Sequence, residues 1–450
     1  MKIGSFTAHM RCHALACILL SVLLCGIMAN ADVHYVATNG ANIHPYTTWS
    51  AAATNIQWAV NAATASDTVL VSNGTYYLTN QVSIAAAITC ASVNGREVTI
   101  VDGNYPHVTN RCFYINGNGV TLDGFTVSNG FSFGNGSVAC GGGIYAYAVS
   151  GYLAKVQNCK ITGNTSSNYM SGGVTNNAYG GGIYCYNRTI VSNCEIDANR
   201  VAGRFAQGGG VYLVASSTNI DCIIASNILI KGSVGAEGQA AWINDSSCAI
   251  DSCKICWNCT GTTNYSTVAL NYGAILRNSL VCNNSSIDGA VKVYNCWGRI
   301  QNCTIVSNSS SGAGYASGGI YIWQVYNYTS YIENVVCYLN TAVSGQSNFL
   351  SYDTGSFSIV NSCISPTSSF PINVSVPNYY FGNIESNPQF VNKDSNDFHL
   401  AQGSPCINSG MNENWMTLDF DGHSRIDRFS GIVDMGCYEY LPQGIFFSVP

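Results

Sequence analysis

Two short motifs recur along most of the sequence, and this repetition restricts the fold more than any other feature. The first motif spans nine residues and ends in the pattern N-C-x-I-x-x-N. Its clearest copies lie at 156–164, 191–199 and 300–308, and looser copies at 219–227, 250–258, 276–284 and 332–340. The second motif begins G-G-G-I-Y or a close variant and lies at 141–147, 180–186, 208–214 and 317–323, with a degenerate copy at 238–244. Copies of the first motif start 24 to 35 residues apart. Such a unit is typical of a solenoid, because one repeat can bury its apolar side only against its neighbours.

Side chains alternate within both motifs, which indicates strands rather than helices. In the second motif, Ile144, Ile183, Val211 and Ile320 share one parity and should be buried in line along one sheet. Right-handed crossovers between parallel strands are strongly preferred. The fold class predicted is therefore all-β, a single-stranded right-handed parallel β-helix, with roughly a dozen coils from about Asp67 to Ile384. A short amphipathic cap helix is expected just before it, in I-Q-W-A-V-N-A-A at 56–63.

The first motif also predicts its turns and its interior. The Asn that precedes Cys, as at 158, 193 and 302, suits a left-handed bend and can hydrogen-bond to its equivalents on neighbouring coils. The cysteines at 159, 194, 222, 253 and 303 share one inward position and are expected to be buried free thiols. Disulfides remain an alternative where Cα atoms approach about 4.4–6.8 Å. A zinc site is not expected at Cys253, Cys256 and Cys259, because no second Cys or His pair accompanies them.

Charge and the N-terminus indicate where the protein works. Only 9% of residues are charged and the net charge is −6, which excludes the basic surface that nucleic-acid binding requires. Lys2 and Arg11, an apolar run at 14–28 and the tripeptide Ala29-Asn30-Ala31 together read as a signal peptide cleaved after Ala31. No other apolar run is long enough to span a bilayer. The protein is therefore expected to be secreted or to lie at the cell surface.

The repeats resemble those of pectate-lyase-like parallel β-helix proteins and of polymorphic outer-membrane proteins. The C-terminal stretch is similar to the choice-of-anchor Q domain of exported bacterial β-helix proteins, through N-P-Q-F (387–390), D-F-H-L (397–400), G-S-P-C-I-N-S-G (403–410), D-F-D-G-H-S-R (419–425) and V-D-M-G-C-Y-E (433–439). The expected organisation is a signal peptide at 1–31, an N-terminal strand and cap at 32–66, the β-helix at 67–385, the anchor-Q-like region at 386–440 and a tail at 441–450.

The resemblance allows enzyme motifs to be sought directly. The acidic and basic motifs of pectin hydrolases and the paired arginines of pectate lyases are missing. Lyase chemistry in divergent β-helices requires less, namely a basic side chain and acids that hold Ca²⁺. Lys160, Glu195 and Asp197 should meet on neighbouring coils and are the catalytic candidates. The alternative is a cross-strand ion pair on a solvated face.

Aromatic residues occupy the outward parity of the second motif. They are Tyr145, Tyr147, Tyr184, Tyr186, Tyr212, Trp242, Tyr321 and Trp323. Their flat faces and polar ends suit the rings of an extended glycan, and Tyr145, Tyr184 and Tyr212 should form a partly exposed column. The alternative is a stack that braces the sheet, covered by the Gly-rich inserts between coils.

A loop at 419–427 offers a candidate calcium site through Asp419, Asp421 and Asp427, although it lacks the spacing of an EF-hand. The alternative is that these acids cap turns and pair with Arg425 and Arg428. No cofactor is required by any motif. The leading hypothesis is a glycan-binding or adhesive β-helix protein without catalysis. The alternatives are a polysaccharide lyase acting on a weakly charged polymer and a passive structural module.

Overall fold

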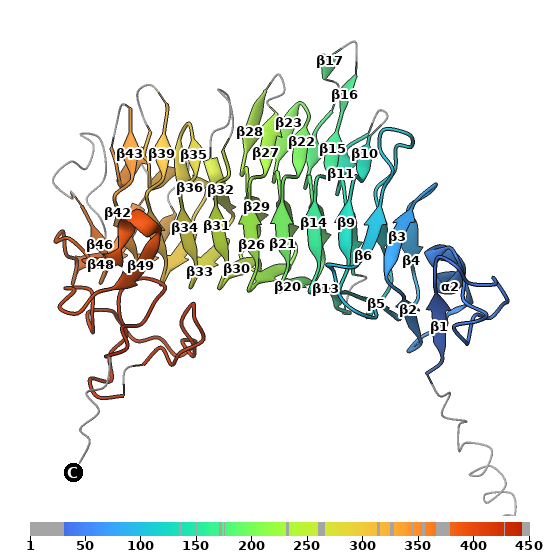
Figure 1. Cartoon of the computed structure of the whole chain (residues 1–450). Helices are drawn as coiled ribbons and strands as arrows, with labels where there is room; N and C mark the ends of the chain where they lie inside the picture. Colours follow the sequence, from blue (N-terminus) through green and yellow to red (C-terminus); the bar gives the residue numbers. More distant parts are fainter. Residues whose placement is uncertain are drawn as a thin grey trace, which may run out of the picture. The chain divides into compact units, whose positions relative to one another are not determined.

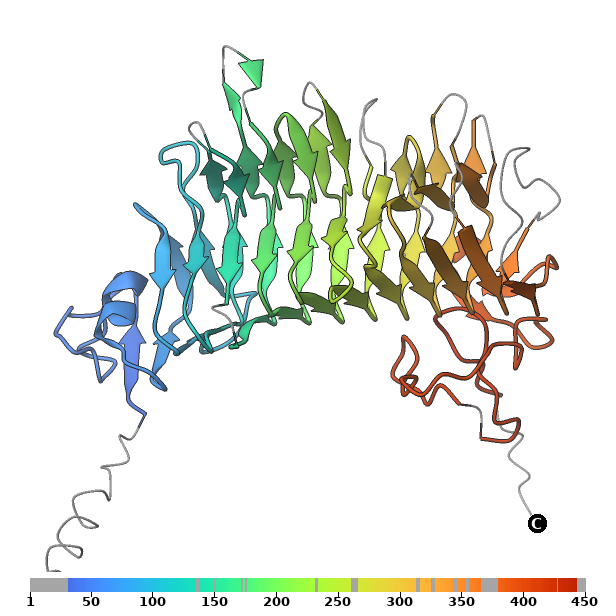
Figure 2. The same cartoon turned by 180° about the vertical axis from the view of Figure 1, so that it is seen from behind.

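The chain winds into a right-handed parallel β-helix whose coils stack along one axis (Figures 1 and 2). The structure is a computed structural model that describes residues 31–442, except 135–136, 149–150, 171–172, 175, 231–233, 260–265, 313–315, 325–327, 344–345, 353–355, 366–378 and 427. Positions 1–30 of the predicted signal peptide and candidate ligand Asp427 therefore lie outside the described residues. In the part described, no helix is long and apolar enough to cross a membrane.

Three long parallel sheets form the walls of the β-helix. Sheet A has thirteen strands, from β1 (Val33–Val36) to β47 (Tyr379–Phe381), and sheet B has eleven, from β3 (Gly74–Tyr77) to β46 (Cys363–Ile364). The ten strands of sheet C are β4 (Val82–Ile84), β7 (Phe113–Ile115), β12 (Ile144–Tyr147), β19 (Ile183–Tyr186), β24 (Val211–Val214), β29 (Ala241–Asn244), β32 (Ser266–Asn271), β36 (Gly289–Asn295), β40 (Ile320–Gln324) and β44 (Phe349–Tyr352). The second motif thus lies on sheet C, and the first crosses the turn between sheets A and B.

The predicted repeat register is confirmed. Ile144 pairs with Ile183, which pairs in turn with Val211, and the same column continues through Ala241, Val268 and Val291 to Ile320. All seven side chains are fully buried in the interior. The backbone conformation explains why glycine recurs at the first position of the second motif. Gly141, Gly180 and Gly208 adopt φ angles of 60°, 56° and 68°, the left-handed region that favours glycine.

The turn between sheets A and B has the predicted left-handed asparagines. Asn158, Asn193 and Asn302 have φ angles of 55°, 50° and 49°, and Asn193 Nδ2 donates to Asn158 Oδ1 at 2.8 Å. The predicted cysteine stack is also present, since Cys159, Cys194, Cys222, Cys253 and Cys303 are buried free thiols. Burial raises their pKa values above the ordinary range where a shift is resolved, as for Cys159. These thiols fill the interior and are unreactive there.

Part of the solenoid carries a second layer, here called the arm, between sheets B and C. Its outgoing strands are β10 (Phe131–Phe133), β15 (Thr165–Ser167), β22 (Arg200–Ala202) and β27 (Ile228–Ile230). Its returning strands are β11 (Ala139–Cys140), β18 (Ala178–Tyr179), β23 (Phe205–Gln207) and β28 (Gly235–Glu237). The two four-stranded sheets share a small core of alanines, Val201 and Leu229. Figure 1 shows the arm extending beyond the strands of sheet B. The inserts between the two motifs in these coils therefore form strands.

Helix α2 (Ile56–Ala62) packs on β1, β2 (Thr68–Val71) and β4 at the N-terminal end of the β-helix. It begins at the cap residue Asn55, whose side chain accepts a hydrogen bond from the backbone N–H of Gln57. At the other end of the chain, residues 386–442 pack on the outside of the later coils through Phe398, Cys437 and Tyr438.

Candidate functional site

The predicted charged cluster forms on the outward face of sheet B. Lys160 on β14 (Lys160–Thr162) lies opposite Glu195 on β21 (Glu195–Asp197). The Lys160 Nζ atom is 3.0 Å from Glu195 Oε1 and 4.0 Å from Asp197 Oδ2. The hydrogen bond to Glu195 is the main cause that raises the pKa of Lys160. The cluster therefore has the geometry of a partly exposed ion pair, and its lysine is held protonated and unsuited to remove a proton.

The aromatic column exists, with its rings stacked on one another. The centroids of Tyr145 and Tyr184 are 5.1 Å apart, those of Tyr184 and Tyr212 are also 5.1 Å apart, and both pairs are inclined by 19°. Tyr147 and Tyr186 form a second stacked pair at 5.4 Å. Because each ring covers the face of the next, the faces of the middle rings are not open to a ligand.

The expected partial exposure of the column is wrong for Tyr212, and two further outward aromatic residues, Trp242 and Tyr321, are also buried. Tyr212, Trp242 and Tyr321 are only 8%, 3% and 5% exposed, whereas Tyr145 and Tyr184 are half-buried. Tyr212 is covered by the arm, whose returning strands lie over this part of sheet C. Tyr179 on β18 stacks on Tyr212 with a centroid distance of 4.9 Å. The column is thus largely an interface between the arm and the β-helix.

A pocket opens at the end of the arm, between β28 and the next coils of sheet C. Its volume is about 280 Å³. The arm contributes Phe205, Gln207 and the segment 234–237, and sheet C contributes Lys292, Tyr294, Tyr321 and Trp323. Asp288 completes the lining. β28 is the last strand of its sheet, so the pocket lies at the step where long coils give way to shorter ones.

The polar centre of this pocket is a buried triad of charges. Lys292 Nζ lies 2.8 Å from Glu237 Oε1 and 2.7 Å from Asp288 Oδ2. The lysine side chain is 4% exposed, and its ammonium lies 5.2, 5.5 and 4.9 Å from the ring centroids of Tyr294, Tyr321 and Trp323. This arrangement combines an ion pair with cation–π contacts.

Burial and pairing set the charges of the triad. Burial raises the pKa values of Glu237 and Asp288, and Lys292 opposes that shift in both. Burial alone would lower the pKa of Lys292, but the two carboxylates outweigh it and raise the value. Lys292 therefore stays protonated and is unsuited to act as a base. The triad carries one positive and two negative charges when all three groups are ionised.

The sequence carries a signal for this site. Lys292 pairs with Tyr321 on β40, so it occupies the outward position that aromatic residues hold in the second motif. The segment G-A-V-K-V-Y-N at 289–295 is a further degenerate copy of that motif. A lysine in an otherwise aromatic column marks an unusual environment. Its partners Glu237 and Asp288 come from segments whose proximity only the fold establishes.

The candidate calcium loop uses its acids internally. Asp419 accepts hydrogen bonds from the backbone N–H groups of Asp421, His423 and Glu439, at 3.0, 2.7 and 2.9 Å. Asp421 Oδ2 lies 2.6 Å from His399 Nε2. Among the described residues, no group of three or more His, Cys, Asp or Glu side chains is arranged to hold a metal ion.

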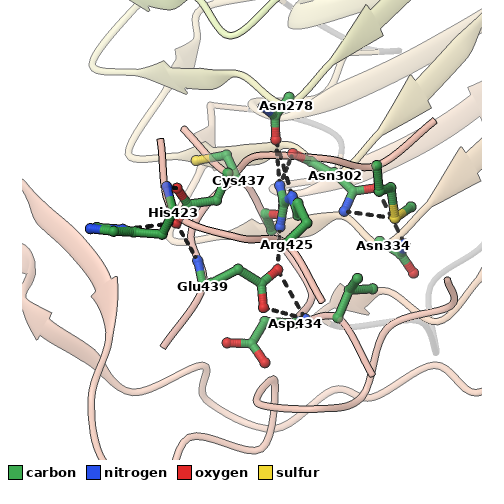
Figure 3. Close-up of polar contacts among 12 residues, drawn as sticks. Asn278, Asn302, Asn334, His423, Arg425, Asp434, Cys437 and Glu439 are labelled. Atoms are coloured by element: carbon green, nitrogen blue, oxygen red, sulfur yellow. Dashed lines mark hydrogen bonds and ion pairs between the residues drawn. The ribbon is translucent and has the colours of Figure 1, made fainter. Parts of the chain in front are cut away.

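Residues 386–442 are fastened to the β-helix by Arg425 (Figure 3). This fully buried side chain donates to Glu439 Oε1 at 2.7 Å, to Asn278 Oδ1 at 2.6 Å and to the Gly436 carbonyl at 2.8 Å. Asn334, another left-handed turn residue, exchanges two hydrogen bonds with the backbone of Met411. The turn asparagines of the later coils therefore bind the C-terminal region.

No protein-family model matches the sequence, and no curated protein matches it. Several solved structures follow a similar chain path at low identity. Pectate lyase Pel9A is 16% identical, with a TM-score of 0.46, over 91% of this chain and 96% of its own. An alginate lyase from a Paenibacillus species is 14% identical, with a TM-score of 0.37, over 68% of this chain and 95% of its own. XylC in complex with xylose is 9% identical, with a TM-score of 0.43, over 92% of this chain and 99% of its own. The likeness of 386–440 to the choice-of-anchor Q domain stays a prediction.

Proposed function

We propose that the protein binds glycans, outside the cell or at its surface, through the pocket at the end of the arm. One observation carries the proposal. The pocket places accessible aromatic surface from Trp323 and Phe205 beside the charged triad. Sugar rings present an apolar face of C–H groups and a rim of hydroxyls, so they match this combination. Most ligand sites likewise combine aromatic walls with a few convergent polar groups.

The stacked tyrosines have a different part in this proposal. A sugar stacks on the face of an aromatic ring, and the middle rings of the column cover one another. Tyr184 and Tyr212 therefore brace the sheet and hold the arm. Tyr147 and Tyr186 are half-buried and offer secondary contacts along a longer glycan.

The alternative function, a polysaccharide lyase, is less well supported by the geometry. A lyase base must accept a proton, and both lysines in acidic clusters, Lys160 and Lys292, are held protonated by carboxylates. We therefore expect no ultraviolet absorbance from unsaturated products when the protein is incubated with a panel of acidic polysaccharides. Appearance of such absorbance would favour the lyase.

Glycan arrays with the mature chain, followed by calorimetry on the best oligosaccharide, test the binding proposal. Trp323→Ala should weaken binding at least about tenfold, which corresponds to roughly 1.4 kcal/mol. Trp58→Ala is the matched control, because Trp58 is an exposed tryptophan on α2 at the far end of the β-helix. Equal affinity of the wild type and a folded Trp323→Ala variant would contradict the proposal.

A further inference from the structure

The residues that line the pocket carry more negative than positive charge. Of the described lining residues, Lys292 is the only cation, and Glu237 and Asp288 are two anions. Both acids contact the same ammonium, at 2.8 and 2.7 Å, so no positive charge is left to pair with a ligand. A bound carboxylate would therefore lie next to a cluster with an excess negative charge in a partly desolvated site, where like charges repel strongly.

The two acids differ in what they can offer to a ligand. Glu237 uses both oxygens, Oε1 for Lys292 and Oε2 for the hydroxyl of Ser266 at 2.7 Å. Asp288 gives Oδ2 to Lys292, and within the described residues its Oδ1 accepts no hydrogen bond. The Asp288 side chain is 14% exposed at the pocket. An ionised carboxylate oxygen is an acceptor only, so its natural ligand partner is a hydroxyl donor.

We infer that this pocket takes an uncharged sugar unit and rejects a uronic acid. A ring hydroxyl donates to Asp288 Oδ1 while the C–H face of the ring lies against Trp323. The inference rests on the proposed function and specifies its ligand class. The role of Lys292 is to neutralise one of the two acids, which lowers the cost of burying both. It does not attract an anion.

The test compares one neutral tetrasaccharide, the best binder on the array, with the same tetrasaccharide oxidised to the carboxylate at C6. The wild type should bind the neutral form at least about tenfold more tightly. Asp288→Asn and Glu237→Gln keep the shapes of the side chains and each remove one negative charge. Each single variant should prefer the neutral tetrasaccharide over the oxidised one by a smaller ratio of affinities than the wild type does. The double variant leaves Lys292 uncompensated and should bind the oxidised form more tightly than the wild type does.

A gain of affinity for the acidic sugar is informative because damage to the fold would produce only losses. If the double variant fails to fold, two other measurements test the charge selectivity. They are the affinity of Asp288→Asn for both sugars and the salt dependence of wild-type binding. Rejection of the oxidised form should then weaken as salt increases, because salt screens repulsion. Equal binding of both sugars by the wild type, with both abolished by Trp323→Ala, would overturn the charge selectivity and leave glycan binding intact. Absence of binding to either sugar would overturn both proposals.

Discussion

Asn227 donates its backbone N–H and its side-chain amide to one atom, Oδ1 of Asn258, at 2.9 and 3.2 Å. The same contact repeats up the interior of the β-helix. The ladder comprises Asn164, Asn199, Asn227, Asn258, Asn284, Asn308, Asn340 and Asn348. Seven of the asparagines each end a copy of the first motif, whereas Asn348 directly precedes β44; all eight are buried. The ladder satisfies backbone groups at the turn that leaves sheet B.

Removing one member should destabilise the whole solenoid. Asn258→Leu would leave two donors of Asn227 without partners, and we expect a loss of about 2–4 kcal/mol in the free energy of unfolding. Denaturant titration measures this loss. Asn94→Ala is the control, since Asn94 is exposed and bonds only to exposed Asn73. Similar stabilities of the two variants would show that the ladder contributes little.

Replacing Asn219 by an apolar residue should stabilise the protein. Asn219 lies in the interior column of sheet A between Val191 and Ile250, and neither its Oδ1 nor its Nδ2 has a partner among the described residues. Because a buried amide without partners is costly, Asn219→Val should raise the free energy of unfolding by about 1–2 kcal/mol. A lower midpoint of thermal unfolding in the variant would contradict this expectation and point to an unseen partner.

Tyr212 should matter for stability more than for binding. Its ring stacks on both Tyr184 and Tyr179 and so joins the arm to sheet C. Tyr212→Ala should cost about 2–4 kcal/mol, as for other large-to-small changes at buried positions. Tyr186→Ala, at a half-buried position outside this interface, should cost less than half as much. The ranking is checked by thermal unfolding of both variants, and equal losses would argue against the brace.

Arg425 should hold the C-terminal region in place. Its guanidinium supplies donors to Glu439, Asn278 and Gly436, so Arg425→Met would leave several buried acceptors unsatisfied and cost about 3 kcal/mol. Limited proteolysis should then cleave within 386–440 much faster than in the wild type. Arg428→Met, at an exposed arginine three residues along, is the control and should leave the cleavage rate unchanged.

The packing of residues 386–440 on the β-helix should become less stable as pH rises. Burial raises the pKa of Glu439 to about 8 although Arg425 opposes the shift. Between its ordinary value and about 8, the folded form retains a proton that the unfolded chain has lost, so stability falls with pH. Burial would lower the pKa of His399, but Asp421 and Asp397 outweigh it and raise the value. Its contribution is present below its ordinary pKa and is lost as pH passes the raised one.

Both shifts act in one direction, so protection of 386–440 from proteolysis or hydrogen exchange should be greater near pH 5.5 than near pH 8.5. In His399→Gln this difference should shrink. Protection that increases with pH in the wild type would contradict the assignment of these two groups.

The sequence by itself determined the solenoid, because the same side-chain alternation and the same turn residues recur in successive coils. Alternation in G-G-G-I-Y places Ile144 and Ile183 inside, and Asn158 and Asn193 mark left-handed bends that few other residues tolerate. The pairing of Lys160 with Glu195 followed from the same register. Each of these predictions depends only on side-chain period and on stacking in line.

Tertiary structure alone decided which outward residues are covered and which charges meet. The inserts of 8 to 15 residues between the motifs show no clear period, so the arm and its burial of Tyr212 and Trp242 could not be predicted from them. Lys292, Glu237 and Asp288 come from two different layers, and their meeting depends on where the arm ends. Burial and pairing across layers are properties of the packed molecule, because they depend on contacts that no local pattern encodes.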